Sequence, residues 1–154
     1  MANSSGSQDS WATSEATRRS MQSNRGRDTG PEMRLRRILH SRGFRYRVDT
    51  RPVRSLNRRA DLVFPTEHLA VFVDGCFWHG CPTHYQAPAS NPAYWQQKVD
   101  DNRRRDRQTD RMLRRNGWSV IRVWEHADPA LAANRIERKV LACRIAISAS
   151  GGVR

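Results

Sequence analysis

The sequence predicts a mixed α/β fold in which helices flank a central mixed sheet. Two short apolar segments, 60–64 and 69–73, enclose a Pro-Thr-Glu-His turn, which is typical of a pair of neighbouring strands. Segments with the apolar spacing of helices lie before and after this pair. The resulting element order is α-β-β-β-α-β-α.

The N-terminal half begins with a predicted helix. Thr29 and Glu32 match the T-x-x-E capping box, apolar residues follow at helical spacing, and Gly43 is a suitable C-terminal residue. Apolar and charged residues then alternate over 44–49, which indicates a half-buried strand. A polar loop follows as far as Asn57.

The C-terminal half contains two further helices and one strand. Residues 92–116 are polar and rich in Arg, with apolar anchors that indicate a helix, continuous or broken, ending at Gly117. Residues 118–124 have apolar side chains on both faces of a strand, which favours a largely buried strand. Residues 130–147 are compatible with a last helix.

Length and composition predict one domain with tails. The 154 residues fit a single domain over 18–148, and residues 1–17, which are rich in Ser and other polar residues, are expected to be a disordered tail, as are residues 149–154. No apolar run approaches the ~18 residues of a membrane span, and no secretory signal is visible. Only three Cys are present, which favours a reducing cytoplasm.

The charge is strongly positive and unevenly placed. The net charge of +13 predicts a polyanionic partner, with nucleic acid as the first candidate. Residues 33–59 contain ten Arg and residues 103–122 eight, whereas residues 60–97 contain neither Lys nor Arg. The central segment therefore carries the chemistry between two basic stretches. The excess of Arg over Lys is explained equally well by codon usage.

Residues 74–84 are the densest in reactive side chains. Cys81 and His84 have the C-x₂-H spacing of a metal-binding pair. A tetrahedral site needs two more ligands, and the available residues are Cys76, His79, Asp106 and His126. The alternative is a buried Cys beside a surface His, without a metal.

Two neighbouring strands deliver an acid and a histidine to this region. Asp61 lies in the apolar strand 60–64, where a carboxylate is costly unless it is paired or metal-bound. The next strand leads directly to His79. This arrangement indicates an active site, although an Asp near the end of a strand is also a common turn former.

Phe77 and Trp78 are consecutive aromatic residues in a predicted loop. In a basic protein, such a pair indicates stacking on nucleic-acid bases or wedging between them. Alternatively, one of the two rings fills the domain core.

The string Asp-Gly-Cys-Phe-Trp-His-Gly-Cys-Pro-x-His at 74–84 strongly resembles the very short patch repair (Vsr) mismatch endonucleases. The resemblance covers roughly residues 18–127 of the printed sequence. The further segments that match in order and spacing are 19–21, 27–32, 60–64, 94–95, 102–106 and 117–125.

The resemblance implies a restriction-endonuclease-like fold of the PD-(D/E)xK type and a set of catalytic residues. Asp61 matches the catalytic acid that binds magnesium, and the backbone carbonyl of Val73 matches a second ligand of that ion. His79 matches the histidine that activates the attacking water or assists the phosphate. Glu32 matches an acidic residue near metal-bound water. Asp74 stands where the family can have His, and it is a further candidate.

The resemblance also implies a structural zinc ion and a DNA-binding surface. Its zinc ligands would be Cys81, His84, Asp106 and His126, which leaves Cys76 as a spare. The implied aromatic wedge consists of Phe77, Trp78 and Trp95, with Met21 acting from the other groove. The Arg-rich stretches, including Arg58, Arg59, Arg103 and Arg105, are expected to contact backbone phosphates.

The expected function is therefore that of a DNA mismatch endonuclease with catalytic Mg²⁺ and structural Zn²⁺. It would nick one strand 5′ to the thymine of a T:G mismatch formed by deamination of 5-methylcytosine. Expected partners are mismatched double-stranded DNA, mismatch-repair proteins and a DNA polymerase. The expected form is a monomer at the nucleoid in the cytoplasm. Two alternatives are a nicking enzyme of a restriction–modification or mobile-element system and a non-catalytic, zinc-stabilised DNA-binding module.

Overall fold

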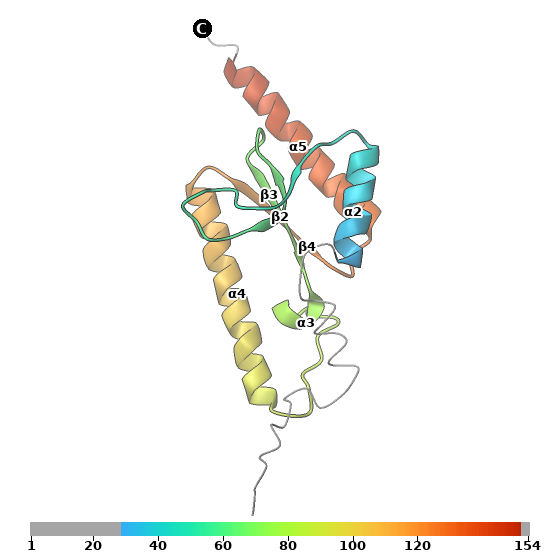
Figure 1. Cartoon of the computed structure of the whole chain (residues 1–154), viewed down its shortest axis with the longest axis vertical. Helices are drawn as coiled ribbons and strands as arrows, with labels where there is room; N and C mark the ends of the chain where they lie inside the picture. The colour runs from blue at the N-terminus through green and yellow to red at the C-terminus, as the bar shows by residue number, and fades with distance from the viewer. Residues whose placement is uncertain (1–28, 152–154) are drawn as a thin grey trace, which may run out of the picture.

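The computed structural model describes residues 29–151, in which helices lie on both sides of a central sheet (Figure 1). The elements before the site are α2 (Gly30–Ser41), β1 (Arg47–Thr50), β2 (Ala60–Phe64) and β3 (Leu69–Asp74). The remaining elements are α3 (Cys76–His79), α4 (Pro92–Arg115), β4 (Ser119–Trp124) and α5 (Pro129–Gly151). The predicted α/β class and element order are confirmed, with the single turn α3 as an addition.

The sheet is mixed and has the strand order β1-β2-β3-β4. β1 pairs with β2 and β2 with β3 in antiparallel fashion, whereas β3 and β4 are parallel. A parallel pair needs a long crossover, and α3, α4 and their loops supply it. Because Val73 pairs with Val123 and Asp74 with Trp124, the chain leaves β3 and β4 at the same edge of the sheet. The segments that follow β3 and β4 therefore begin close together.

The alternation of side chains along the strands divides the core between the two faces. On one face, Leu62 and Val71 pack with residues of α2 and α5, including Leu39 and Ile136. On the other face, Val63, Ala70 and Phe72 pack against Leu113 of α4. Figure 1 shows α4 on one side of the sheet and α2 with α5 on the other.

β4 follows the predicted alternation but is less buried than expected. Ile121 and Val123 join the α2/α5 face, and Trp118 and Val120 pack on the α4 face. However, β4 is an edge strand, and only Ile121 and Val123 are buried among its residues. The prediction of a largely buried strand was therefore wrong, because apolar groups on two faces say nothing about position within the sheet.

The capping box at the start of α2 does not form. Thr29 is the N-cap residue, but its side chain makes no capping hydrogen bond. Glu32 instead turns inward and accepts a hydrogen bond from Arg36 at 3.0 Å. The Glu32 carboxylate is thus engaged with Arg36 rather than with the helix N-terminus.

The other long helices are continuous. α4 is unbroken over its 24 residues. α5 continues through Gly151, beyond residue 149, where the disordered C-terminus was expected to begin. The predicted tail 1–17 and Met21 lie outside the described residues. Among the residues described, no helix is long and apolar enough to cross a membrane.

Candidate active site and metal centre

Asp61 lies near the start of β2, and its carboxylate accepts a hydrogen bond from the backbone of the neighbouring strand β3. The N–H of Val73 donates to Oδ2 of Asp61 at 2.7 Å. Burial raises the pKa of Asp61 to about 7, and the negative charges of Glu32 and Asp74 add to this effect although the Val73 N–H opposes it. Glu32 itself is only 5% exposed. Several carboxylates at one partly buried point form a place where a cation is favoured.

His79 and Asp106 form a tightly hydrogen-bonded pair. His79 is the last residue of α3, and Nδ1 of its ring lies 2.5 Å from Oδ2 of Asp106 on α4. Burial acts to lower the pKa of His79, but the hydrogen bond to Asp106 and the charges of Asp74 and Asp106 outweigh it and raise the pKa. Since Nδ1 faces Asp106, Nε2 is the ring nitrogen left to act on a ligand, and it lies 3.9 Å from Oδ1 of Asp74.

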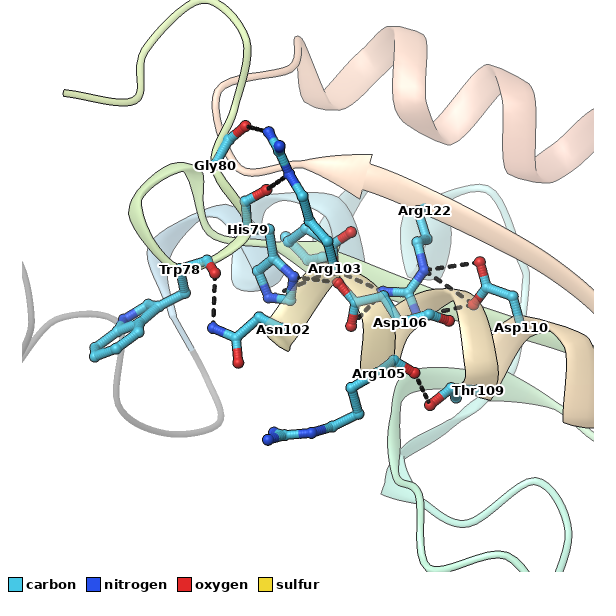
Figure 2. Close-up of polar contacts among 12 residues, drawn as sticks. Trp78, His79, Gly80, Asn102, Arg103, Arg105, Asp106, Thr109, Asp110 and Arg122 are labelled. Atoms are coloured by element: carbon cyan, nitrogen blue, oxygen red, sulfur yellow. Dashed lines mark hydrogen bonds and ion pairs between the residues drawn. The ribbon is translucent and has the colours of Figure 1, made fainter. Parts of the chain in front are cut away.

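Two residues that the sequence reasoning missed complete this network. Arg122 of β4 forms ion pairs with Asp74 at 2.9 Å and with Asp110 at 2.8 Å. The signal was present, because an Arg between apolar residues of a strand needs a buried partner, and Asp110 follows Asp106 by one helical turn. Figure 2 shows Arg122 between Asp106 and Asp110.

These groups surround one cavity of about 500 Å³. Asp61, Glu32, Val73, Asp74 and His79 all line it. The structure thus brings together every residue predicted for the catalytic site. The further residues of its wall are Thr29, Arg58, Arg59, Phe72, Gly75, Trp78, Asn102, Arg105, Asp106, Thr109, Arg122 and Glu125.

Three of the four arginines predicted to bind DNA line this cavity. Arg58 donates to the Thr109 hydroxyl at 3.1 Å, and Arg59 pairs with Asp49 at 3.1 Å while remaining exposed. Arg105 is exposed, and its guanidinium extends away from the network in Figure 2. Cations at the mouth of an acidic cavity can receive the phosphates on either side of a bound phosphodiester.

The fourth arginine, Arg103, instead holds the chain that carries His79. Its Nε donates to the His79 carbonyl at 3.1 Å, and its Nη2 donates to the Gly80 carbonyl. Asn102 donates to the Trp78 carbonyl at 2.7 Å (Figure 2). These contacts use the cationic side chain of Arg103 for positioning α3, which differs from the predicted phosphate contact.

Gly80 ends α3 in a conformation that suits only glycine. Its φ is +61°, and a Cβ at this position would overlap Cγ1 of Val99 and the guanidinium of Arg103. α3 was not predicted, since a single turn leaves no periodicity to detect. It alters the surroundings of Phe77 and Trp78, which belong to this turn rather than to a loop.

A second group of reactive side chains lies beside the cavity. One ligand atom from each of Cys76, Cys81, His84 and His126 lies within 4.8 Å of all the others. Sγ of Cys76 is 3.0 Å from Nδ1 of His126, and Sγ of Cys81 is 3.6 Å from Nδ1 of both His84 and His126. Two thiols and two imidazoles are a complete donor set for tetrahedral Zn²⁺.

The two thiols differ in how readily they ionise. Burial raises the pKa of Cys76 to about 12, and the charge of Glu125 and the neighbouring Cys81 add to the rise. Burial also opposes ionisation of Cys81, but hydrogen bonds from His84 and Thr83 outweigh it and lower the pKa to about 6. The thiolate of Cys81 is thus favoured and that of Cys76 is disfavoured. A bound divalent ion would stabilise both thiolates and so remove this difference.

The resemblance implied that Asp106 is a zinc ligand and that Cys76 is a spare, and the structure places the two residues the other way round. Asp106 belongs with Asp74 and His79 in a separate group, and Cys76 takes the fourth position of the sulfur and imidazole group. The spacing alone leaves Cys76 among the available ligands, and the resemblance then makes it a spare. Only the turn of α3 brings Cys76 back to Cys81 and His84. The Cys76 N–H also donates to Oε1 of Glu125 at 3.0 Å, and Glu125 lines the cavity.

The predicted wedge residues are packed against one another. The ring centroids of Phe77 and Trp95 are 5.4 Å apart, and those of Phe77 and Trp78 are 5.3 Å apart. Trp95 is only 3% exposed, whereas Phe77 and Trp78 are partly exposed. Trp95 is therefore the buried ring against which the other two pack. Phe77 and Trp78 are the aromatic rings that a ligand can reach.

Comparison with known proteins identifies the family of the chain. The family model described as DNA mismatch endonuclease Vsr matches residues 9–85. Type II nicking enzyme V.NaeI of Lentzea aerocolonigenes is 45% identical over 112 residues, which make up 71% of this chain and 68% of that protein. Type II nicking enzyme V.XorIIP of Xanthomonas oryzae pv. oryzae is 40% identical over 72% of this chain and 80% of that protein.

A named mismatch endonuclease is also similar. DNA mismatch endonuclease Vsr of Escherichia coli is 36% identical over 102 residues, which make up 66% of this chain and 64% of that protein. The mixed sheet with flanking helices is the restriction-endonuclease-like fold of this family. Taken with the cavity described above, these matches show that the chain belongs to the Vsr family of endonucleases, hydrolases that cleave phosphodiester bonds.

Proposed function

We propose that this enzyme nicks one strand of duplex DNA on the 5′ side of the thymine in a T:G mismatch. The observation that carries the proposal is that Asp61 and His79, from different strand ends, line the same cavity. An acid that suits a metal and a histidine that suits proton transfer are the two groups that phosphodiester hydrolysis requires. The 36% identity to the E. coli DNA mismatch endonuclease supports a mismatched duplex as the substrate, and T:G is the mismatch that the resemblance implies.

The acidic side of the cavity fits a magnesium ion. Asp61 would hold the ion, with the Val73 carbonyl as a further ligand and Glu32 beside it. These are oxygen donors, and burial together with the negative charges of Glu32 and Asp74 raises the pKa of Asp61, an effect that a bound cation would counter. A bound Mg²⁺ would neutralise the phosphoryl oxygens and stabilise the leaving 3′ oxygen.

His79 would handle the proton of the attacking water. Asp106 accepts a hydrogen bond from Nδ1–H of His79. This bond fixes the ring and leaves Nε2 directed at the cavity. As the water oxygen bonds to phosphorus, its proton passes to Nε2, and the bond from phosphorus to the 3′ oxygen breaks. The leaving 3′ oxygen takes a proton from solvent. The products are a 3′ hydroxyl and a 5′ phosphate. The negative charges of Asp106 and Asp74 stabilise the resulting imidazolium.

The basic and aromatic residues around the cavity would bind the duplex. Arg58, Arg59 and Arg105 would contact backbone phosphates, which positions DNA without reading its sequence. Phe77 and Trp78 would enter the stack beside the mismatch, since a mismatched step costs less to unstack than a paired one. A 3′ hydroxyl at the nick is a primer end, so a DNA polymerase and mismatch-repair proteins at the nucleoid are the expected partners.

We further propose that Cys76, Cys81, His84 and His126 hold a structural zinc ion. The support is the complete set of four nitrogen and sulfur donors within 4.8 Å of one another. Such an ion would cross-link α3 to the segment after β4. It would thereby fix the distance from α3, which carries Phe77, Trp78 and His79, to the sheet.

A panel of short duplexes tests the proposed function. Each duplex would carry a different mismatch in varied flanking sequence, with Mg²⁺ present, and the products would be sized on denaturing gels. We expect cleavage of one strand 5′ to the mismatched thymine and at least a 100-fold loss in Asp61→Ala and His79→Ala, in the range of about 10²–10⁴ for an acid or base in catalysis. Equal cutting of matched DNA, or full activity in both variants, would contradict the proposal.

The names of several relatives favour a second candidate. The proteins at 45% and 40% identity are called type II nicking enzymes. The enzyme would then serve a restriction–modification system, and its nicking would depend on the sequence around the mismatch. Strong preference of the duplex panel for a single flanking sequence would favour this candidate over general T:G repair.

A further inference from the structure

Arg122 lies at the centre of three aspartates and uses all of its nitrogens there. Nη1 is 2.9 Å from Asp74 and 3.6 Å from Asp106, and Nη2 is 2.8 Å from Asp110. Nε also donates to the Asp110 carboxylate at 3.0 Å. The guanidinium packs over the ring of Phe72 with 4.3 Å to its centroid, and Figure 2 shows it directed at α4.

Two of these aspartates are the ones that flank His79. Asp106 accepts from one ring nitrogen, and Asp74 lies 3.9 Å from the other. The same guanidinium therefore contacts both carboxylates beside the imidazole. We propose that Arg122 is a positioning residue of the nicking reaction, which holds Asp74 and Asp106 in place and so fixes the ring of His79 towards the phosphate. This inference rests on the proposed nuclease function.

Electrostatics explain why a guanidinium is needed. Burial raises the pKa of Asp74, and Arg122 and His79 oppose that rise. Without a cation, the negative charges of Asp74, Asp106 and Asp110 would repel one another in a site where Asp74 is 7% exposed. The planar fork of Arg can bind several carboxylates in fixed directions, whereas the ammonium of Lys is a point charge.

Direct binding of DNA by Arg122 is the competing explanation, because Arg122 also lines the cavity. Its contacts argue against it. All three nitrogens already donate to carboxylates, and a phosphate would have to displace one of them. The exposed Arg105 is the better phosphate ligand.

The two explanations differ in single-turnover kinetics. We would measure the nicking rate constant at saturating enzyme, and separately the Kd for the same mismatched duplex with Ca²⁺ in place of Mg²⁺. For Arg122→Met we expect a rate about 100-fold lower, the size of loss that a misplaced catalytic group causes, with Kd unchanged within about twofold. Arg122→Lys should recover part of the rate. Arg135→Met is the matched control, because Arg135 is exposed and, within residues 29–151, its side chain donates only to the backbone carbonyl of Arg122.

A spectroscopic measurement separates this proposal from the nuclease proposal. The Nδ1 proton of His79, which faces Asp106, should give a downfield imidazole signal that is absent in His79→Gln. We expect this signal to shift or broaden in Arg122→Met and to stay in place in Arg135→Met. If the wild type nicks no DNA, the nuclease proposal fails, but the signal still tests whether Arg122 orders the pair.

Three outcomes would overturn the inference. The first is an unchanged rate and an unchanged His79 signal in folded Arg122→Met. The second is weaker DNA binding with an unchanged rate, since that identifies a phosphate contact.

If Arg122→Met does not fold, Asp110→Asn takes its place, because Asp110 holds the guanidinium from outside the cavity wall. We expect a smaller rate loss there, and no loss would be the third outcome.

Discussion

Burial and nearby negative charges disfavour the ionised form of Asp61. Its pKa of about 7 in the folded chain lies above the ordinary value of 3.8. The folded state therefore binds this proton more tightly than the unfolded state, and the benefit to stability is complete below about pH 4 and lost as the pH rises through about 7. At about 1.36 kcal/mol per pKa unit, the shift from 3.8 to about 7 corresponds to a loss on the order of 4 kcal/mol.

We predict that magnesium-free protein unfolds at a lower temperature at pH 8 than at pH 5.5, and that Mg²⁺ reverses the loss at pH 8. Thermal unfolding in buffers free of both Mg²⁺ and chelators, so that any zinc stays bound, would measure this. Asp61→Asn cannot ionise, so its unfolding temperature should depend less on pH and should not respond to Mg²⁺. An equal pH response in wild type and variant would show that other groups dominate.

Cys76 is the residue that distinguishes the zinc ligand set proposed from the structure from the set implied by resemblance. We predict about one zinc per chain in the natively purified wild type and almost none in Cys76→Ser, because three remaining donors do not close a tetrahedral site. Elemental analysis measures this directly. Cys143→Ser is the control, since Cys143 lies on α5 away from the group. Zinc retained in Cys76→Ser but lost in Asp106→Asn would favour the implied set.

At the scale of elements, α3 brings several of the candidate site residues together. This one turn carries Cys76 at its start, the two accessible aromatic rings in its middle and His79 at its end. It is too short to be stable alone, and Asn102 and Arg103 of α4 hold its carbonyls. α3 therefore depends on its packing for its conformation.

We predict that Gly80→Ala destabilises the protein more than Gly117→Ala does. Both glycines have positive φ, which costs an L-residue about 1–2 kcal/mol, but a Cβ at Gly117 meets no atom within 4 Å whereas one at Gly80 overlaps Val99 and Arg103. Urea unfolding of both variants would measure the difference. Gly80→Ala should also slow nicking, since it moves His79. Equal losses in the two variants would mean that the neighbouring side chains yield easily.

α4 supplies the other half of the site along one stripe of its surface. Arg103, Asp106 and Asp110 follow one another at spacings of three and four and face α3 and β4, while Val99 and Leu113 are buried before and after them. This explains how an Arg-rich helix remains attached to the sheet: its polar stripe is satisfied by β4 and α3 rather than by water.

At the scale of the whole molecule, part of the positive charge behind the net +13 lies around the cavity. Much of the inner charge is already paired, as with Arg122, whereas Arg105 is exposed beside the cavity. We predict that Arg105→Ala weakens binding to all duplexes alike and lowers the slope of log K against log salt by about 1, with stability unchanged. Filter binding or fluorescence anisotropy at several salt concentrations would measure this.

Two arginines serve as comparisons for that prediction. Arg138→Ala removes the same charge from an exposed position on α5, on the opposite side of the sheet, and should change the salt slope little. Arg103→Ala should instead lower the unfolding temperature, because Arg103 holds the end of α3. A salt slope that falls equally in Arg105→Ala and Arg138→Ala would indicate that binding depends on total charge alone.

The sequence by itself determined the elements and most of the reactive residues. Apolar alternation in 60–64 and 69–73 and helical spacing elsewhere are local properties, and they predicted the mixed α/β class and element order. The resemblance identified several of the residues that line the cavity, among them Asp61 and His79. Local patterns suffice for this because burial on one face dictates them.

Only the tertiary structure decided which partner each side chain has. Cys76 joins the sulfur and imidazole group, and Asp106 turns to His79, because α3 and α4 cross at that point. The same packing buried Trp95, engaged Arg103 with α3 and placed Arg122 among three aspartates. These pairings join residues from 12 to 50 positions apart whose mutual distance no local pattern fixes, since the registry of strands and the packing of α4 set it.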